Sequence, residues 1–222
     1  MIFSARPSPP DLDSIRVVSW DVDGTLYSIR RAAWQVARRA AKLTFAGRRL
    51  YPIRELAELG ELLGRVERAR ADATNRSGID AGFDRRRELE GRWWAPAIET
   101  LGPRPGVKAL LGHFQGRVRA QVVLTDYEAD YKLQGLGLAE YFTAVYVGER
   151  MGSFKPSPAP YARILEDFGL APECMLHIGD RVDTDGAGAA AAGCPSLVLR
   201  KDFRSFGELY TMLAAKGRSA PP

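Results

Sequence analysis

A short apolar run that ends in two closely spaced carboxylates is the feature that most constrains the fold of this chain. Residues 15–20 are mostly apolar and predict a buried strand, and Asp21 and Asp23 follow it directly. Gly24 lets the chain leave the strand in a conformation that other residues resist, and Thr25 adds a hydroxyl beside the acids. Ligands bind at the carboxyl ends of strands in open α/β sheets, so the segment predicts a site at such an edge.

The pattern of the remaining chain predicts an α/β fold with a doubly wound parallel sheet. Four more apolar segments are typical of strands, and helical stretches separate them, as in βαβ units. The predicted strands are residues 15–20, 118–124, 144–148, 175–179 and 196–199. The predicted helices between and after them are residues 107–114, 130–136, 158–168 and 205–215.

The segment after the first strand has a different texture and predicts a smaller, all-helical domain. Apolar residues recur at helical spacing in residues 29–45, 52–73 and 83–101. Between Tyr27 and Arg104 the chain carries 17 Lys and Arg against 10 Asp and Glu, whereas the remainder is slightly acidic. Two interpretations stay open: arginines that coat solvated helix faces, or a positive field that attracts an anionic substrate. We expect both Trp93 and Trp94 to belong to the core of this domain.

Length and cysteine content set the expected organisation and location. The predicted parts are a discontinuous sheet domain at 14–26 and 104–216, a helical domain at 27–103, and flexible tails at 1–13 and 217–222. A chain of 222 residues can bury a stable core without disulfides or structural metal. Only Cys174 and Cys194 are present, without metal-binding spacing, so we expect a reducing, cytoplasmic compartment. No apolar run is long enough to span a bilayer, so we expect no membrane partner. We also expect the protein to be a monomer or a homodimer.

The predicted fold brings several acids to one edge of the sheet. Asp21 and Asp23 follow the first strand, and Asp180 and Asp185 follow the fourth. Two carboxylates about 4 Å apart repel by about 4 kcal/mol at an effective dielectric constant near 20, so such a cluster invites a divalent cation. Ligands that are all oxygen favour Mg²⁺ over zinc.

Four motifs along the chain resemble, in order, the signatures of the haloacid dehalogenase-like (HAD) hydrolases. The first is Asp-Val-Asp-Gly-Thr-Leu, and each of the others follows or neighbours an apolar strand. The four motifs are residues 21–26, the strand end Thr125-Asp126, Lys155 just before Pro156, and residues 178–185 with Asp180 and Asp185. The resemblance covers about residues 15–199 and implies a Rossmann-like core with a helical cap that closes over the active site.

The resemblance also implies a reaction, namely phosphatase chemistry through an aspartyl-phosphate. Asp21 would be the nucleophile, and Asp23 would protonate the leaving group and later take a proton from water. Thr125, the main-chain N–H of Asp126 and Lys155 would hold the transferring oxygens.

Binding roles follow from the same resemblance. The Asp21 and Asp180 carboxylates and the Asp23 carbonyl would bind Mg²⁺, and Asp185 would support them from behind. Gly24 belongs to the expected substrate site. Asp183 follows Asp180 too closely to fit the family spacing, so it is predicted to be a surface acid.

Further residues of the cap and core have their own predictions. Arg48 and Arg49 lie in a predicted loop of the cap and are candidates to contact a substrate anion. His113 and His177 show no evident partner in the sequence, so both are predicted to be structural.

Three functions compete with a phosphatase of small metabolites. A phosphosugar mutase would use the same four motifs and return the phosphoryl group to its substrate. Dehalogenase chemistry is disfavoured, since the resembling family generally lacks an acid at the position of Asp23 in that class. A non-catalytic binding protein could use its arginine-rich cap on nucleic acid, but the acids are intact and no nucleic-acid module is evident. We therefore expect a small phosphorylated substrate and no nucleic acid.

Overall fold

The computed structural model describes residues 12–47, 51–71 and 83–216, and in them five parallel strands form one sheet. The strands lie in the order β3-β2-β1-β4-β5. Their bounds are β1 (Val17–Trp20), β2 (Ala120–Thr125), β3 (Ala144–Val147), β4 (Met175–Gly179) and β5 (Ser196–Val198). The predicted doubly wound α/β fold is thus confirmed, with strand ends shifted by one or two residues.

Helices cover both faces of the sheet. The helices of the sheet domain are α5 (Val107–Phe114), α6 (Asp130–Leu136), α7 (Gly148–Met151), α8 (Ala159–Phe168), α9 (Ala187–Ala191) and α10 (Phe206–Lys216). Short turns complete it at η1 (Ala139–Tyr141), η2 (Pro172–Cys174) and η3 (Val182–Gly186). Val17 packs with apolar residues of α8 and α9, while its neighbour Val18 packs with those of α5, α6 and α10. This alternation explains why the strands are apolar on both sides.

The strand order places the predicted site residues at one edge. From β1 the chain builds outward through β2 and β3, then returns to the other side of β1 for β4 and β5. Trp20 is in register with Val123 of β2 and Ile178 of β4, so the three strands end side by side. Crevices form where the winding direction reverses, and here that place lies between β1 and β4.

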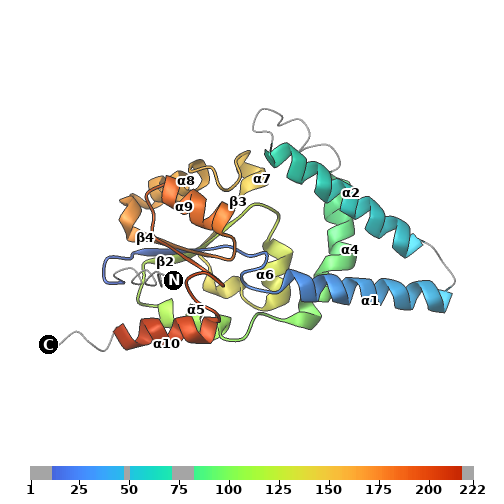
Figure 1. Cartoon of the computed structure of the whole chain (residues 1–222), viewed down its shortest axis with the longest axis horizontal. Helices are drawn as coiled ribbons and strands as arrows, with labels where there is room; N and C mark the ends of the chain where they lie inside the picture. Colours follow the sequence, from blue (N-terminus) through green and yellow to red (C-terminus); the bar gives the residue numbers. More distant parts are fainter. Residues whose placement is uncertain (1–11, 48–50, 72–82, 217–222) are drawn as a thin grey trace, which may run out of the picture.

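The described residues of the cap form three long helices: α1 (Ile29–Gly47), α2 (Tyr51–Ala71) and α4 (Phe83–Leu101). They confirm the predicted helical texture of this segment, and they lie beside the sheet domain in Figure 1. Trp93 is buried among Val36, Leu59 and Leu89, as predicted. Trp94 is half-buried and also contacts the main core.

The cap is joined to the sheet domain by buried charge as well as by apolar packing. Helix α4 packs along α6. The solvated interpretation of the cap arginines does not hold for Arg86, which is 1% exposed and lies 2.5 Å from Glu149 of α7. Within the described residues, we find no helix of the length and apolarity that crossing a membrane requires. Leu12, inside the predicted N-terminal tail, packs against the core.

Candidate active site

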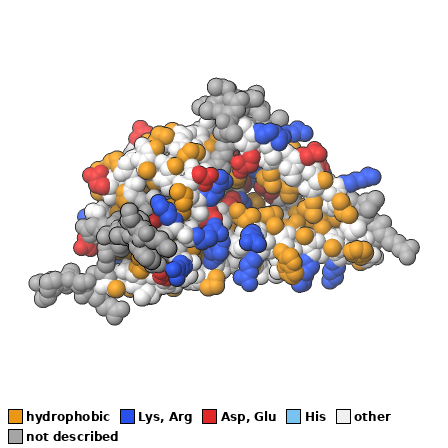
Figure 2. All heavy atoms as spheres, in the orientation of Figure 1, with side chains coloured by type: hydrophobic (Ala, Val, Ile, Leu, Met, Phe, Trp, Pro, Cys, Tyr) orange, Lys and Arg blue, Asp and Glu red, His pale blue; other side chains and the backbone are white. Residues whose placement is uncertain are grey.

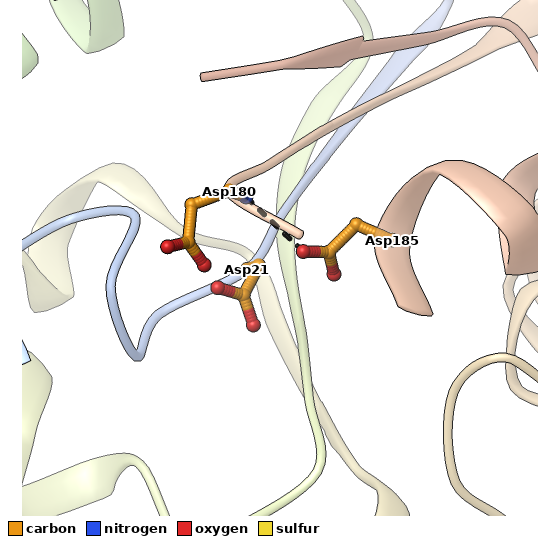
Figure 3. A group of neighbouring side chains, drawn as sticks. All are labelled: Asp21, Asp180 and Asp185. Atoms are coloured by element: carbon orange, nitrogen blue, oxygen red, sulfur yellow. Dashed lines mark hydrogen bonds between the residues drawn. The ribbon is translucent and has the colours of Figure 1, made fainter. Parts of the chain in front are cut away.

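Three acids from separate segments meet at the carboxyl end of the sheet. Asp21 follows β1, Asp180 follows β4, and Asp185 lies in the η3 turn. One carboxylate oxygen from each lies within 4.8 Å of the others, and Figure 3 shows the three groups gathered around one point. The structure thus brings together three of the four acids for which the sequence predicted convergence. Asp21 and Asp185 are buried, and Asp180 is half-buried.

Two glycines make this close approach possible. Gly24 has a φ of 93°, in the left-handed region, and a Cβ there would lie 2.5 Å from Oδ2 of Asp180. A Cβ on Gly179 would collide with the Asp185 side chain. Any larger residue at these positions would push the acids apart.

Lys155 sits between two of the acids. Its Nζ donates to Oδ1 of Asp21 and Oδ1 of Asp185, each at 2.6 Å, and its side chain is 2% exposed. Its main-chain N–H donates to Oδ1 of Asp126 at 2.9 Å, which fixes the start of the side chain. The ammonium therefore offsets part of the negative charge of the cluster.

Burial and neighbouring charges shift the pKa values of the cluster in opposite directions. Burial raises the pKa of Asp21 to about 8, although Lys155 opposes the rise. Burial acts the same way on Asp185, but Lys155 and His177 outweigh it and hold the Asp185 pKa below its usual range. Burial also raises the pKa of Asp180. The three carboxylates supply only oxygen ligands from a partly buried site, and a hard dication with oxygen ligands would fit them.

His177 has two partners, so the prediction that it lacked any was wrong. Its Nε2 lies 3.2 Å from Oδ1 of Asp185, and its Nδ1 lies 2.7 Å from Oγ of Ser19. The ionised Asp185 can only accept, so Nε2 donates and the Ser19 hydroxyl donates to Nδ1. Burial lowers the pKa of His177, which agrees with a neutral ring. His177 of β4 therefore helps to hold the Asp185 carboxylate in place. The alternation of residues along the strand could not predict this contact. His113 also has a neighbour, because Arg117 Nη1 lies 3.1 Å from its Nε2.

Main-chain donors complete the support of Asp185. The N–H groups of Asp180 and Arg181 donate to its Oδ2 at 3.1 and 3.0 Å. The Tyr161 hydroxyl donates to the carbonyl of Asp185 at 3.2 Å. Both carboxylate oxygens of Asp185 thus accept hydrogen bonds. Its place in the η3 turn explains the five-residue spacing from Asp180.

The carboxylate of Asp23 is held by residues that the sequence did not reveal. Lys132 of α6 donates from Nζ to Oδ2 of Asp23 at 2.6 Å. The Tyr27 hydroxyl donates to Oδ1, and it accepts a hydrogen bond from Nε1 of Trp94 at 3.0 Å. A lone Lys on a helix carries no sequence signal, and Tyr27 is distinguished only by lying four residues after Asp23.

A cavity of about 110 Å³ opens over the acids, between the sheet domain and the cap. Its lining residues are Asp21, Asp23, Ile29, Glu67, Thr125, Asp126, Tyr127, Lys155, Asp180, Arg181, Thr184 and Asp185. Ile29 and Glu67 come from cap helices, and the Tyr127 hydroxyl donates to Oε1 of Glu67 at 2.6 Å. In Figure 2 a hollow lies between the two parts, with acidic and basic side chains along its rim. The sequence had not singled out Glu67 or Tyr127.

The remaining predicted site residues have diverse placements. Thr125 is buried at the end of β2, and the Gly24 carbonyl accepts from Nε and Nη2 of Arg104 at 3.0 and 2.8 Å. Arg200, which the sequence had not indicated, donates to Oδ2 of Asp180 at 2.5 Å. Asp183 is exposed and pairs with Arg181, as expected of a surface acid. Arg48 and Arg49 lie outside the described residues, so their role stays a prediction.

Known proteins share both the sequence pattern and the fold. The family model of the haloacid dehalogenase-like hydrolases matches residues 15–193. The phosphoglycolate phosphatase of Shigella dysenteriae serotype 1 is 30% identical over 216 residues, which cover 88% of this chain and 85% of the relative.

Solved structures add evidence on the fold. The putative HAD-hydrolase YfnB of Bacillus subtilis, bound to magnesium, has a TM-score of 0.65 at 19% identity, covering 90% of this chain and 99% of that one. The 2-haloacid dehalogenase of Pseudomonas syringae pv. Tomato has a TM-score of 0.60 at 22% identity, covering 91% and 99%. Fold likeness alone therefore includes enzymes of different reactions, whereas the sequence match over most of both chains is to a phosphatase. The chain belongs to the haloacid dehalogenase-like hydrolase family, and within it to the phosphoric monoester hydrolases.

Proposed function

We propose that this enzyme is a Mg²⁺-dependent phosphatase that hydrolyses a small phosphorylated metabolite through an aspartyl-phosphate on Asp21. The observation that carries the proposal is the cluster of Asp21, Asp180 and Asp185 with Lys155, under a small cavity at the reversal of the sheet. Within the described residues, this is the group of acids that offers oxygen atoms close enough for one cation.

The metal would be held by oxygen atoms of the loops after β1 and β4. The Asp21 and Asp180 carboxylates and the Asp23 main-chain carbonyl would bind it directly, and Asp185 would hold the loop that carries Asp180. When bound, Mg²⁺ supplies positive charge that stabilises the oxygens of the transferring phosphoryl group. The close approach of the three carboxylates supports this assignment, because a nearby dication would favour their ionised forms.

The side chains around the cavity would divide the reaction among them. Asp21 attacks phosphorus, and the bond to the leaving oxygen breaks as Asp23 gives that oxygen a proton. Asp23 then takes a proton from the water that attacks the aspartyl-phosphate, which releases inorganic phosphate and restores Asp21. Thr125, the Asp126 N–H and Lys155 would contact the phosphoryl oxygens, and all three residues line the cavity.

The size of the cavity supports a small substrate. A volume of about 110 Å³ is well below that of pockets for drug-sized ligands, which hold roughly 300–1,000 Å³. We propose that the cap, residues 27–103, contacts the leaving group, with Arg48 and Arg49 as candidates for an anionic substituent. The phosphoglycolate phosphatases among the relatives make 2-phosphoglycolate the first compound to assay. We further propose a cytoplasmic location and a monomer or homodimer.

A turnover screen tests the proposal. Phosphorylated sugars, nucleotides and short acids are assayed for phosphate release with Mg²⁺ and with EDTA. Asp21→Asn should abolish release, and EDTA should do so reversibly. Isomerised sugar phosphate without free phosphate would instead identify a mutase. Phosphate release that survives both EDTA and Asp21→Asn would contradict the proposal.

Asp23 has its own test in the choice of leaving group. A proton donor matters most when the departing oxygen is a poor leaving group, so Asp23→Asn should lose far more activity on an alkyl phosphate than on p-nitrophenyl phosphate. The same loss on both substrates would show that Asp23 is not mainly an acid.

A further inference from the structure

We propose that Lys132 is a positioning residue that orients Asp23 for proton transfer, an inference that rests on the role proposed for Asp23 above. Lys132 lies on α6, six residues after the second family motif, and belongs to none of the four motifs. Its side chain is 4% exposed, and its Nζ lies 2.6 Å from Oδ2 of Asp23. A buried ammonium without a partner strongly destabilises the folded state, so we expect Lys132 to keep its contact with Asp23.

The second oxygen of Asp23 is held as firmly as the first. Oδ1 accepts from the hydroxyl of Tyr27, which is fully buried. Because the Tyr27 oxygen already accepts from Nε1 of Trp94, the orientation of its hydroxyl is restricted and its hydrogen points to Asp23. With one donor on each oxygen, the plane of the Asp23 carboxylate is determined.

The cation of Lys132 lies among other buried charges, and it influences the nearest of them electrostatically. Glu90 of α4 is 6% exposed, and the charge of Lys132 opposes the rise that burial causes in the Glu90 pKa. Arg86 lies 3.5 Å from Glu90 and 2.5 Å from Glu149. The buried charges near Lys132 therefore come from the cap helix α4 and the core helix α7.

This arrangement has a consequence for the reaction. Lys132 would keep Oδ2 in place, so Oδ1 would be the oxygen that carries the proton to the leaving group and later takes one from water. In the ionised form of Asp23, Oδ1 accepts from Tyr27. Proton transfer needs hydrogen-bond distance, and a misplacement of about 1 Å can cost on the order of 100-fold in rate. An apolar residue in place of Lys132 would fill the space but leave Oδ2 without this donor, so the Asp23 carboxylate could turn about its contact with Tyr27.

The test compares leaving groups in variants that keep the buried charges balanced. Lys132→Met alone would leave Arg86 to offset both Glu90 and Glu149, so the main variant is Lys132→Met with Glu90→Gln, and Glu90→Gln alone is its control. Lys132→Arg restores the charge, and Lys108→Met is a matched change at an exposed lysine. Unfolding by urea and circular dichroism establish that each variant is folded.

We expect the double variant to lose about 10- to 100-fold in kcat on an alkyl phosphate and less than about threefold on p-nitrophenyl phosphate, because only the first needs a well-placed proton. Lys132→Arg should recover part of the loss, and Lys108→Met should have no effect. Added to Asp23→Asn, the Lys132 change should cost little more, since both act through one group.

Equal losses on the two substrates would overturn the inference, because a purely structural lysine would slow both alike. A loss that adds in full to that of Asp23→Asn would also overturn it. If Asp23→Asn itself shows no dependence on leaving group, then the proposed role of Asp23 fails first, and that outcome is distinguishable from failure of Lys132 alone.

Discussion

Replacing Asp21 with Asn should stabilise the metal-free protein, by an amount that depends on pH. The pKa of Asp21 is about 8 in the folded chain against 3.8 for an ordinary carboxyl. Between these values the folded chain binds a proton that the unfolded chain has released, so this group lowers stability as pH rises through the window. At about 1.4 kcal/mol per pKa unit, the penalty is at most about 2 kcal/mol at pH 5.5 and about 4 kcal/mol at pH 7. Asp21→Asn removes it.

Urea unfolding in EDTA, followed by tryptophan fluorescence, measures this gain. The difference in unfolding free energy between Asp21→Asn and the parent should grow from pH 5.5 to pH 7. Asp183→Asn removes an exposed acid of the same segment and serves as the control, with no such trend. Saturating Mg²⁺ should stabilise the parent and narrow the gap, because binding to the folded state adds stability. A gain that is absent, or equal at both pH values, would refute the electrostatic reasoning.

Three further perturbations test other parts of the site. Gly24→Ala should lose more than about 100-fold in activity and about 1 to 3 kcal/mol in stability, measured by kinetics and urea unfolding, since φ at this residue is 93°; near-parental activity would contradict this. Tyr127→Phe removes a contact with cap helix α2 and should raise KM about fivefold with little change in kcat, from the loss of about 1 kcal/mol; an unchanged KM would show that the contact does not assist binding. The double variant Arg48→Ala/Arg49→Ala should raise KM for the best natural substrate by the factor that corresponds to a loss of about 1 to 3 kcal/mol in binding free energy, and it should leave KM for p-nitrophenyl phosphate unchanged. Unchanged kinetics on both substrates would place these arginines on the solvated surface.

Local sequence pattern was sufficient for the sheet and for the acids at its edge. Apolar runs identified the five strands that the structure describes. Two of these strands, β1 and β4, are each followed directly by a carboxylate of the cluster. Asp21 and Asp180 could be found in this way because parallel strands bring their carboxyl ends together whatever the side chains beyond them. The role of Gly24 could be predicted from its position, because the chain turns sharply after the strand and needs a left-handed backbone conformation there.

Partners that are distant in the sequence could not be predicted, because nothing local specifies them. The contact of Lys132 with Asp23 joins residues 109 positions apart and depends on how α6 lies against the loop. The strand pattern correctly predicted that His177 is buried in the sheet, but its partner Asp185 contacts it only because the η3 turn brings that residue back over β4. Arg86 belongs to an arginine-rich helix that suggests a solvated surface, and its burial depends on Glu149, which is 63 positions away in the sequence, as well as on Glu90 of its own helix.

The most direct measurement of the central claim is to trap the aspartyl-phosphate on Asp21. Turnover of the best substrate with Mg²⁺ is quenched rapidly, and borohydride reduces any acyl phosphate to an alcohol, which converts the phosphorylated aspartate to homoserine. Peptide mass spectrometry should then find homoserine at position 21, only when both substrate and Mg²⁺ are present. Active turnover with Asp21 unmodified, or with homoserine at another acid, would contradict the assignment of the nucleophile.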